Sequence, residues 1–480
     1  MRLAILGGGG FRTPLVYAAL AAGDSGVTEV VLYDTDAGRL DVIANVLRSR
    51  VEVYPWMEGT ESARALGYTS TDGGLDQAPA VTMSTELDAA LEGADFVFSA
   101  IRVGGLAARV QDERVALELG VLGQETTGAG GIAYGLRTIP VARRIAQRVR
   151  AVAPQAWVLN FTNPAGMVTE AMRHVLGDRV VGICDTPITM AKRAARLLGV
   201  DPHAAVALDY IGLNHLGWLR GLQVAGEDLL PWLLADDRLL GATEEGRLFG
   251  LDWIRQIGAL PNEYLYYYDF TRDAVASIRA GGLTRGEFLA GQQRDFYAAA
   301  AADPEGAADL WTATRAEREA TYMAAEHAGR SRVGAEGLAD VGGYEGVAVG
   351  VMRAIARDER ATMILDVANR GTVAGLPDDA VVEVPVTVGA DGPIPLAVSP
   401  PTLYQLGLMA QVKHVERLTI EAAVTGSTHL AEQAFAQHPL VDSVTVARQL
   451  LQAYRERIPE VADVFKRRQT RRSSSPVSTS

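Results

Sequence analysis

The sequence contains only one cysteine, Cys184, in 480 residues. A single cysteine cannot form an internal disulfide bond, which favours a protein of the reducing cytoplasm. No run of about 18 or more apolar residues occurs, so we predict no transmembrane helix. The first residues, MRLAILGGGG, carry an apolar run too short for a secretory signal peptide. These absences predict a cytoplasmic protein with no membrane partner.

An excess of basic residues is also missing. The formal net charge is −13 at pH 7, which argues against nucleic acid or an anionic membrane surface as a partner. It does not exclude an anionic substrate, because a pair of arginines can hold a phosphate within an acidic protein. The hydrophobic content of 48% is typical of a globular protein, and the length exceeds one ordinary core. We therefore expect two packed units.

Short apolar segments alternate with helical patterns in the first part of the chain. The segments read RLAIL, EVVLYD, ADFVFSA, AWVLNF and RVVGIC. This alternation predicts an α/β fold with a parallel sheet covered by helices on both faces. We predict a Rossmann-like NAD-binding domain over residues 1–190 and a mixed α+β substrate domain over 191–460. A basic, serine-rich tail over 461–480 is expected to be disordered.

Four glycines follow the first predicted strand and precede a helical pattern. Backbone N–H groups and a helix N-terminus can hold a pyrophosphate at such a turn. The acidic residue that closes the second predicted strand suits the ribose diol of NAD. The third fingerprint glycine is missing, since Thr13 stands near its place, and a tight turn of a flavodoxin-like domain is the alternative. The predicted cofactor-binding residues are Gly7, Gly8, Gly9, Gly10, Phe11, Arg12 and Asp34.

Cys184 ends a predicted strand, and His215 lies near the end of another strand-like run. A thiolate and an imidazole suit a divalent transition-metal ion. Two protein ligands would leave positions open for substrate oxygens. The alternative is a cysteine that packs as a small hydrophobic residue and a histidine with ordinary polar contacts. Spacing alone leaves both interpretations open.

Further polar residues accompany this pair. Asp185 is either a proton donor or acceptor beside a metal or the N-cap of the helix that follows. The segment EYLYYYDF supplies phenols at positions 264, 266, 267 and 268. A nearby cation would make one of them a base, and otherwise they are aromatic packing. Three arginines suit phosphate oxygens or form ordinary ion pairs: Arg102, Arg109 and Arg285.

Long motifs follow one another from residue 1 to about residue 455. They include GGGGFRTP, IRVGG, DERVALELGVLGQETTGAGGIAYGLRTIPV, NFTNPAGMVTEA, GICDTP, GLNHLGW, EYLYYY, LTRGE, NRGTVAGLPDDAVVEVP and KHVERLTIEAAVTG. In this order they resemble glycoside hydrolase family 4, and most of all its 6-phospho-β-glucosidases. The resemblance implies hydrolysis of a phosphorylated disaccharide or aryl glucoside with NAD and a divalent metal, expected to be Mn²⁺. It also implies a homodimer or homotetramer.

The resemblance implies a redox route in place of the usual pair of carboxylates. NAD⁺ oxidises C3 of the sugar, and the C2 proton is then removed. The aglycone leaves by elimination, water adds, and the hydride returns to the sugar.

Family positions also imply roles for individual residues. Cys184 and His215 match the metal ligands. Tyr264 matches the catalytic base, and Asp185 lies where some members place an acid. Substrate contacts are implied for Arg109, Asn163, Arg285 and Arg102, with the GQET stretch, including Glu125, near the same pocket.

Asp185 departs from the β branch of the family, which usually has asparagine after the cysteine. Aspartate there resembles the 6-phospho-α-glucosidases, whereas GGGGFRTPLVY and NFTNPAGMVTEA resemble the β branch. A 6-phospho-α-glucosidase and a glycosidase of unphosphorylated sugars therefore stay open. A malate- or lactate-type NAD dehydrogenase and a non-catalytic NAD-binding regulator are the alternatives from other classes.

Overall fold

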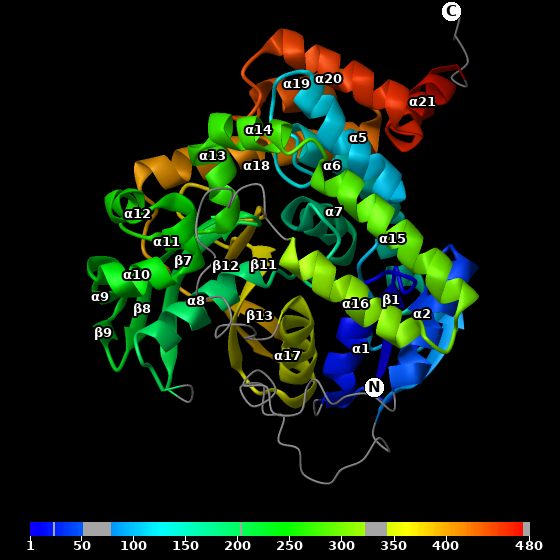
Figure 1. The fold of residues 1–480 in the computed structure, drawn as a ribbon, viewed down its shortest axis with the longest axis horizontal. Coiled ribbons are helices and arrows are strands. Elements are labelled where there is room, and N and C mark those ends of the chain that lie inside the picture. Colours follow the sequence, from blue (N-terminus) through cyan, green and yellow to red (C-terminus); the bar gives the residue numbers. More distant parts are fainter. Residues whose placement is uncertain (23–24, 51–77, 202–203, 322–342, 474–480) are drawn as a thin grey trace, which may run out of the picture.

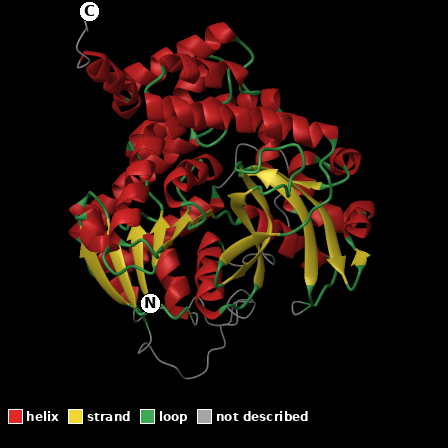
Figure 2. Ribbon diagram, turned by 180° about the vertical axis from the view of Figure 1, so that it is seen from behind, coloured by secondary structure: helices red, strands yellow, loops and turns green. Residues whose placement is uncertain are grey.

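The computed structural model describes residues 1–22, 25–50, 78–201, 204–321 and 343–473. Within these ranges the main sheet has a parallel N-terminal half and an antiparallel C-terminal half. Figure 2 shows the two halves side by side, with many of the helices gathered above them.

In the described ranges, six strands form the parallel half: β1 (Arg2–Leu6), β2 (Glu29–Tyr33), β3 (Ala80–Ser84), β4 (Phe96–Ser99), β5 (Trp157–Asn160) and β6 (Val180–Gly182). Their order is β3-β2-β1-β4-β5-β6, and each neighbouring pair is parallel. This is the strand order of doubly wound dinucleotide-binding folds, in which ligands bind beside the point where the order reverses. The predicted Rossmann-like sheet is confirmed.

Helices cover both faces of the parallel half. Ile5 of β1 packs in a cluster with α1 (Thr13–Ala22), whereas Leu6 packs on the opposite face with α6 (Gly128–Val152). Successive side chains of a strand point to opposite faces, so a strand buried on both sides must be apolar throughout. None of the helices in the described parts of the chain is long and apolar enough to cross a lipid bilayer.

The sheet continues from β6 into the antiparallel half through a pairing of Gly182 with Asp366. The path runs β11-β12-β7-β8-β10, with β13 beside β12 and β9 beside β8. The strands are β7 (Val206–Leu213), β8 (Leu216–Val224), β9 (Glu227–Asp228), β10 (Leu260–Pro261), β11 (Ala361–Ala368), β12 (Val381–Gly389) and β13 (Gly392–Pro395). The predicted mixed second half is confirmed. The domain division at residue 190 stays a proposal, because the sheet runs on across it.

The last helices of the chain return to the N-terminal half. They are α18 (Leu403–Thr425), α19 (Thr428–Gln437) and α20 (Val444–Arg457), and they contact one another, α6 and α5 (Gly105–Glu118). Figure 1 shows α19 and α20 at the same end of the molecule as α5 and α6.

The prediction of a disordered tail from residue 461 is wrong for most of that segment. The chain continues as helix α21 (Pro459–Ser473). Val461, Val464 and Phe465 recur at helical spacing and are buried in the cluster that α6 and α20 share. This apolar face packs the start of the helix against the core. The overall basic composition of the segment did not indicate such a face. Residues 474–480 lie outside the described residues.

Candidate active site

A cavity of about 1820 Å³ opens at the carboxyl ends of the parallel strands. Gly7 follows β1, Asp34 follows β2 and Ala100 follows β4, and all three line it. Ligands of open α/β sheets bind at this edge. The cavity also brings together these predicted site residues: Gly10, Phe11, Arg12, Arg102, Arg109, Glu125, Asn163, Cys184, Asp185, His215, Tyr264 and Arg285. Gly8 and Gly9 belong to the predicted set but do not line the cavity.

The glycine turn lies against its neighbouring strands without space for side chains. Gly7 has a φ of +86°, and a Cβ there would lie 2.6 Å from the carbonyl oxygen of Ala100. A Cβ on Gly8 would lie 2.7 Å from Cβ of Leu32. Only glycine fits these positions, so the turn keeps its backbone close to the end of the sheet. A tight turn, the feature on which the alternative interpretation depends, is therefore present. At Gly8 the missing side chain lets this turn pack against Leu32 of β2.

Asp34 is held at the end of β2 by the same turn. Its Oδ2 accepts a hydrogen bond from the backbone N–H of Gly9 at 3.1 Å, and its Oδ1 accepts one from Asp36 at 3.2 Å. Each carboxylate oxygen has a further lone pair that can accept from a hydroxyl group. Arg39 lies beside it, where its Nε donates to the carbonyl oxygen of Gly9. A carboxylate and a guanidinium group thus line the same corner of the cavity.

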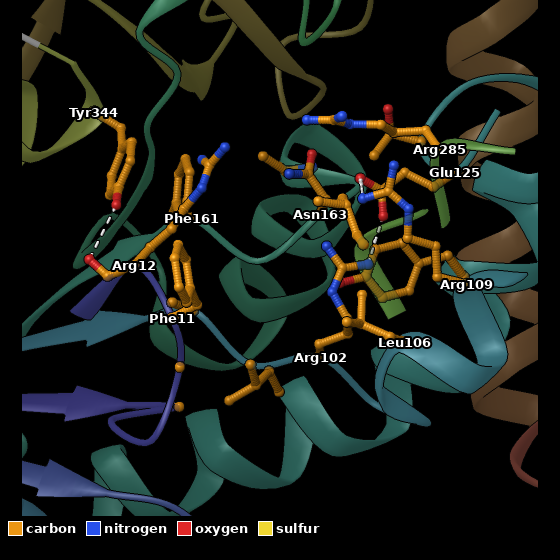
Figure 3. A pocket seen from close by; sticks show the side chains of 18 of the residues that line it. Phe11, Arg12, Arg102, Leu106, Arg109, Glu125, Phe161, Asn163, Arg285 and Tyr344 are labelled. Carbon is orange, nitrogen blue, oxygen red and sulfur yellow. Dashed lines mark hydrogen bonds and ion pairs between the residues drawn. The ribbon is translucent and has the colours of Figure 1, made fainter. Parts of the chain in front are cut away.

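Phe11 and Arg12 differ in what their side chains contact. Phe11 is buried and stacks on Trp311, with the ring centroids 5.6 Å apart, so its side chain is part of the hydrophobic core. The guanidinium group of Arg12 lies 5.2 Å from the ring centroid of Tyr344, which in turn stacks on Phe161. Figure 3 shows this aromatic group on one side of the cavity and the arginines around Glu125 on the other, with Asn163 between them.

Cys184 follows β6 and is buried at the cavity. Burial, together with the neighbouring carboxylates of Glu383 and Asp185, raises the pKa of the Cys184 thiol well above its ordinary value. The group is therefore a neutral thiol at pH 7 unless a cation displaces its proton. A bound metal ion has that effect on cysteine.

His215 occupies the turn between β7 and β8 with a φ of 63°. This left-handed conformation is uncommon for a residue with a side chain. Burial lowers the pKa of His215 to about 4, even though Glu125 acts in the opposite direction. The imidazole is therefore neutral at pH 7, which is the form that binds metals.

The donor set at this site fits a metal ion with open coordination positions. Cys184 and His215 line one cavity and supply sulfur and nitrogen, which suit divalent transition metals. Within the described ranges, no group of three or more His, Cys, Asp or Glu side chains is placed to hold a metal ion. A closed structural metal site is therefore absent from this part of the chain. The remaining ligands of a metal at Cys184 and His215 would be oxygens from outside the protein.

The four tyrosines of the cluster lie in different surroundings. Tyr264 stacks on the imidazole of His215, with the ring centroids 3.8 Å apart and an angle of 2° between the planes. Tyr267 also lines the large cavity. Tyr266 is buried and stacks on Phe270, and Tyr268 lines a separate small cavity behind His215. Of the four, only Tyr264 and Tyr267 reach the large cavity.

Asp185 stands at the N-cap position of α8 (Thr186–Leu197). Its backbone oxygen accepts a hydrogen bond from Thr189, but its side chain makes no capping hydrogen bond. The carboxylate lines the cavity instead. Asp185 therefore occupies the N-cap position, as one interpretation predicted, but its side chain does not cap the helix and is available to a ligand in the cavity.

Glu125 lies at the centre of the arginine group. Its two oxygens bind Arg102 at 2.5 Å and Arg109 at 2.8 Å. Burial alone would raise its pKa, but these two cations lower the pKa of Glu125 to about 2. Glu125 is therefore ionised and holds both arginines at the cavity. Arg109 also binds Glu113 at 2.9 Å.

Arg318 is a cavity residue that the sequence analysis missed. It lies on α16 (Ala307–Ala320), and Arg285 donates to its backbone oxygen at 2.8 Å. Burial and repulsion from Arg12, Arg109 and Arg285 lower the pKa of Arg318 to about 9. Arg318 stays charged at pH 7, and the repulsion, which is a smaller cause than burial, shows that several guanidinium groups gather at this end of the cavity. The helical segment ATRAEREA contains several charged residues and gave no sign that one of them faces the cavity.

Two family models match the chain. The Family 4 glycosyl hydrolase model matches residues 73–200, and the Family 4 glycosyl hydrolase C-terminal domain model matches residues 210–441. The chain belongs to glycosyl hydrolase family 4. This membership confirms the resemblance at the level of the family and decides against the malate- or lactate-type dehydrogenase.

Curated members of glycosyl hydrolase family 4 include relatives of both anomeric specificities. The chain is 31% identical to the maltose-6′-phosphate glucosidase of Bacillus subtilis, with 94% of each chain covered. It is 32% identical to the 6-phospho-beta-glucosidase of Escherichia coli, over 78% of this chain and 81% of that one. At this level of identity the relatives leave the choice between α and β linkages open.

Solved structures of family 4 members share the fold over nearly the whole chain. A 6-phospho-beta glucosidase from Thermotoga maritima with NAD and glucose-6-phosphate gives a TM-score of 0.76 at 27% identity, with 96% of this chain and 99% of that one covered. A 6-phospho-alpha-glucosidase from gut microorganisms in complex with NAD and Mn²⁺ gives 0.74 at 27% identity, with 95% and 97% covered.

Proposed function

We propose that this family 4 enzyme hydrolyses 6-phosphoglucosides with NAD and a divalent metal ion, Mn²⁺. The observation that carries the proposal is the content of one cavity. It combines a glycine turn with Asp34, a thiol and imidazole pair, and a group of arginines around Glu125. The solved relatives that bind NAD, Mn²⁺ or glucose-6-phosphate support the same set of ligands.

The arginine end of the cavity suits the 6-phosphate. A phosphate dianion would offset the repulsion between Arg318 and the neighbouring guanidinium groups of Arg109 and Arg285. Arg285 and Arg318 both line the cavity, and Arg285 is held there by donating to the backbone oxygens of Arg318 and Thr321. We assign the two arginines as the principal phosphate ligands. Arg102 and Arg109 are paired with Glu125, but a guanidinium group has five N–H donors and can share them with a substrate.

The opposite end of the cavity suits the chemistry at the sugar ring. Cys184 and His215 would hold the metal ion, and the glycine turn with Asp34 would hold NAD. When bound, NAD⁺ would supply a reversible hydride acceptor for C3, and a metal ion would supply the polarisation that makes the C2 proton acidic.

Tyr264 and Asp185 are the proposed acid and base. Tyr264 takes the proton from C2 while the bond from C1 to the leaving oxygen breaks. Asp185, in its protonated form, gives a proton to that oxygen. The residue lines the cavity and its side chain makes no capping hydrogen bond, so it is available for this transfer. Water then adds its hydroxyl group at C1 and gives its other proton to Asp185, while Tyr264 returns a proton to C2.

We propose β-linked substrates first, from the glycine-turn and NFTNPAGMVTEA motifs, and α-linked substrates as the second candidate. Asp185 favours the second candidate, because aspartate after the cysteine resembles the α branch. Elimination does not depend on a nucleophile on a defined face of C1, so the chemistry alone accommodates both anomers. The homodimer or homotetramer implied by the family stays a prediction.

A panel of four p-nitrophenyl glucosides, α and β, with and without the 6-phosphate, tests this function. The assay contains Mn²⁺, NAD⁺ and a thiol reductant that keeps Cys184 reduced. We expect p-nitrophenol release from a phosphorylated member and no net NADH. Equal turnover of the phosphorylated and unphosphorylated glucosides would show that the enzyme does not require the 6-phosphate. Absence of turnover across the panel would favour the non-catalytic regulator.

A further inference from the structure

The imidazole ring of His215 is fixed from several directions. Its backbone occupies a left-handed turn, and its ring lies flat on Tyr264. Its Nδ1 lies 3.2 Å from the hydroxyl oxygen of Thr126, which comes from the loop between α5 and α6. One edge of the ring therefore has a defined hydrogen-bond partner.

A second partner of the Thr126 hydroxyl bears on the direction of that hydrogen bond. The side-chain oxygen of Gln124 accepts from the backbone N–H groups of Thr126 at 2.6 Å and Thr127 at 2.7 Å. It also accepts from the Thr126 hydroxyl at 3.1 Å. An amide oxygen only accepts, and a hydroxyl group has a single hydrogen to donate. The geometry allows the Thr126 hydroxyl to donate that hydrogen to Gln124, and its oxygen then acts as an acceptor toward His215.

We propose that Thr126 is a positioning residue that holds His215 in its Nδ1–H tautomer and leaves Nε2 as the nitrogen for a metal ion. The inference rests on the proposed metal role of His215. Metal-binding histidines commonly donate their second ring N–H to a neighbouring acceptor, which fixes the ring and raises the basicity of the ligating nitrogen. Here a neutral hydroxyl group, held in turn by Gln124, takes that place.

The same loop connects the two ends of the cavity. Glu125 binds Arg102 and Arg109, and Thr126, the next residue, contacts His215. The backbone between them is held by Gln124. A substrate that binds Arg102 and Arg109 would therefore lie next to Glu125 and Thr126, and Thr126 also orients His215.

The tautomer is measured directly in the metal-free, full-length protein labelled with ¹⁵N-histidine. Long-range ¹H–¹⁵N correlation distinguishes the two tautomers, and His215→Asn identifies the signal among the seven histidines. We expect the Nδ1–H form in the native protein at pH 7. The Nε2–H form would overturn the inference, and this result requires neither metal nor catalysis.

Mn²⁺ titration by electron paramagnetic resonance tests the consequence for the metal. Thr126→Val should weaken Mn²⁺ binding about 10- to 100-fold, and Thr126→Ser, which keeps the hydroxyl, should bind as the native protein does. Equal affinity in the valine and serine variants would overturn the positioning role. Full affinity in His215→Asn would instead refute the proposed metal ligand, so the two failures are distinguishable.

Discussion

The imidazole of His215 lies flat on the phenol ring of Tyr264, with the centroids 3.8 Å apart and the planes 2° from parallel. This contact fixes the proposed base against the proposed metal ligand, although the two residues come from different elements. It also distinguishes Tyr264 within its cluster, because Tyr266 stacks on Phe270 and Tyr268 stacks on His438. The stacking therefore supports the choice that the family resemblance made.

Tyr264→Phe keeps the ring and removes the hydroxyl group. We expect kcat to fall about 10²- to 10⁴-fold, the usual contribution of a positioned acid or base. Mn²⁺ affinity should stay near the native value, because the stacked ring remains. Tyr266→Phe is the matched control, since Tyr266 is buried outside the large cavity, and it should leave kcat near native. A Tyr264→Phe enzyme with native kcat would remove this residue as the base.

Arg318→Ala tests the phosphate contact. Loss of a charge-assisted hydrogen bond costs about 1.5–3 kcal/mol, so KM for a phosphorylated glucoside should rise about 10- to 100-fold. KM for the unphosphorylated sugar should change little. Arg315→Ala is the control, because Arg315 lies on the same helix, pairs with Glu319 and does not line the cavity. The same rise in KM for both sugars would argue against a phosphate ligand.

Glu125 gives the stability a predictable pH dependence. Its pKa is about 2 in the folded protein, below the ordinary value of a glutamate. Its contribution is therefore fully present above about pH 4.5 and disappears as the pH falls toward 2. Glu125→Gln should cost about 3 kcal/mol of unfolding free energy at pH 7. The difference from the native protein, measured by urea unfolding between pH 7 and 3, should shrink on the acid side, and a constant difference would contradict the ion-pair account.

Asp34→Asn tests the cofactor corner. Asparagine keeps an oxygen that can accept from Gly9 but removes the charge beside Arg39. NAD⁺ should bind about tenfold more weakly, because a charged acceptor of the ribose hydroxyls is lost. NADP⁺ should gain relative to NAD⁺, since Arg39 remains to meet a 2′-phosphate. Nucleotide titration by protein fluorescence measures both, and an unchanged preference would contradict the role of Asp34.

The sequence alone predicted the parallel sheet because strands buried on both faces are apolar throughout, as in RLAIL. It also predicted Cys184 and Asp34 at the site for one physical reason. Residues that directly follow parallel strands meet at the carboxyl edge of the sheet, where ligands bind. His215 was found in the same way, at the end of a strand-like run, although its strand proved to be antiparallel.

The residues that the sequence analysis missed depend on contacts between distant segments. Thr126 belongs to the GQET stretch that the resemblance placed near the pocket, but it lies 89 positions from His215, and no local signal in the sequence predicted its contact with that residue. Arg318 lies in a polar helix whose charges look like a solvated face, and only tertiary packing turns one of them inward. Helix α21 was missed because three buried apolar residues were outweighed by a basic, serine-rich composition.

Hydrogen exchange at C2 of the sugar tests the central claim most directly. The enzyme is supplied with a 6-phosphoglucoside, Mn²⁺ and NAD⁺ in D₂O, and the product is analysed by NMR spectroscopy and mass spectrometry. The account predicts glucose 6-phosphate with deuterium at C2, because the proton that Tyr264 removes exchanges with solvent before it returns. Product that keeps its original C2 hydrogen in every molecule would contradict elimination and point to direct displacement at C1.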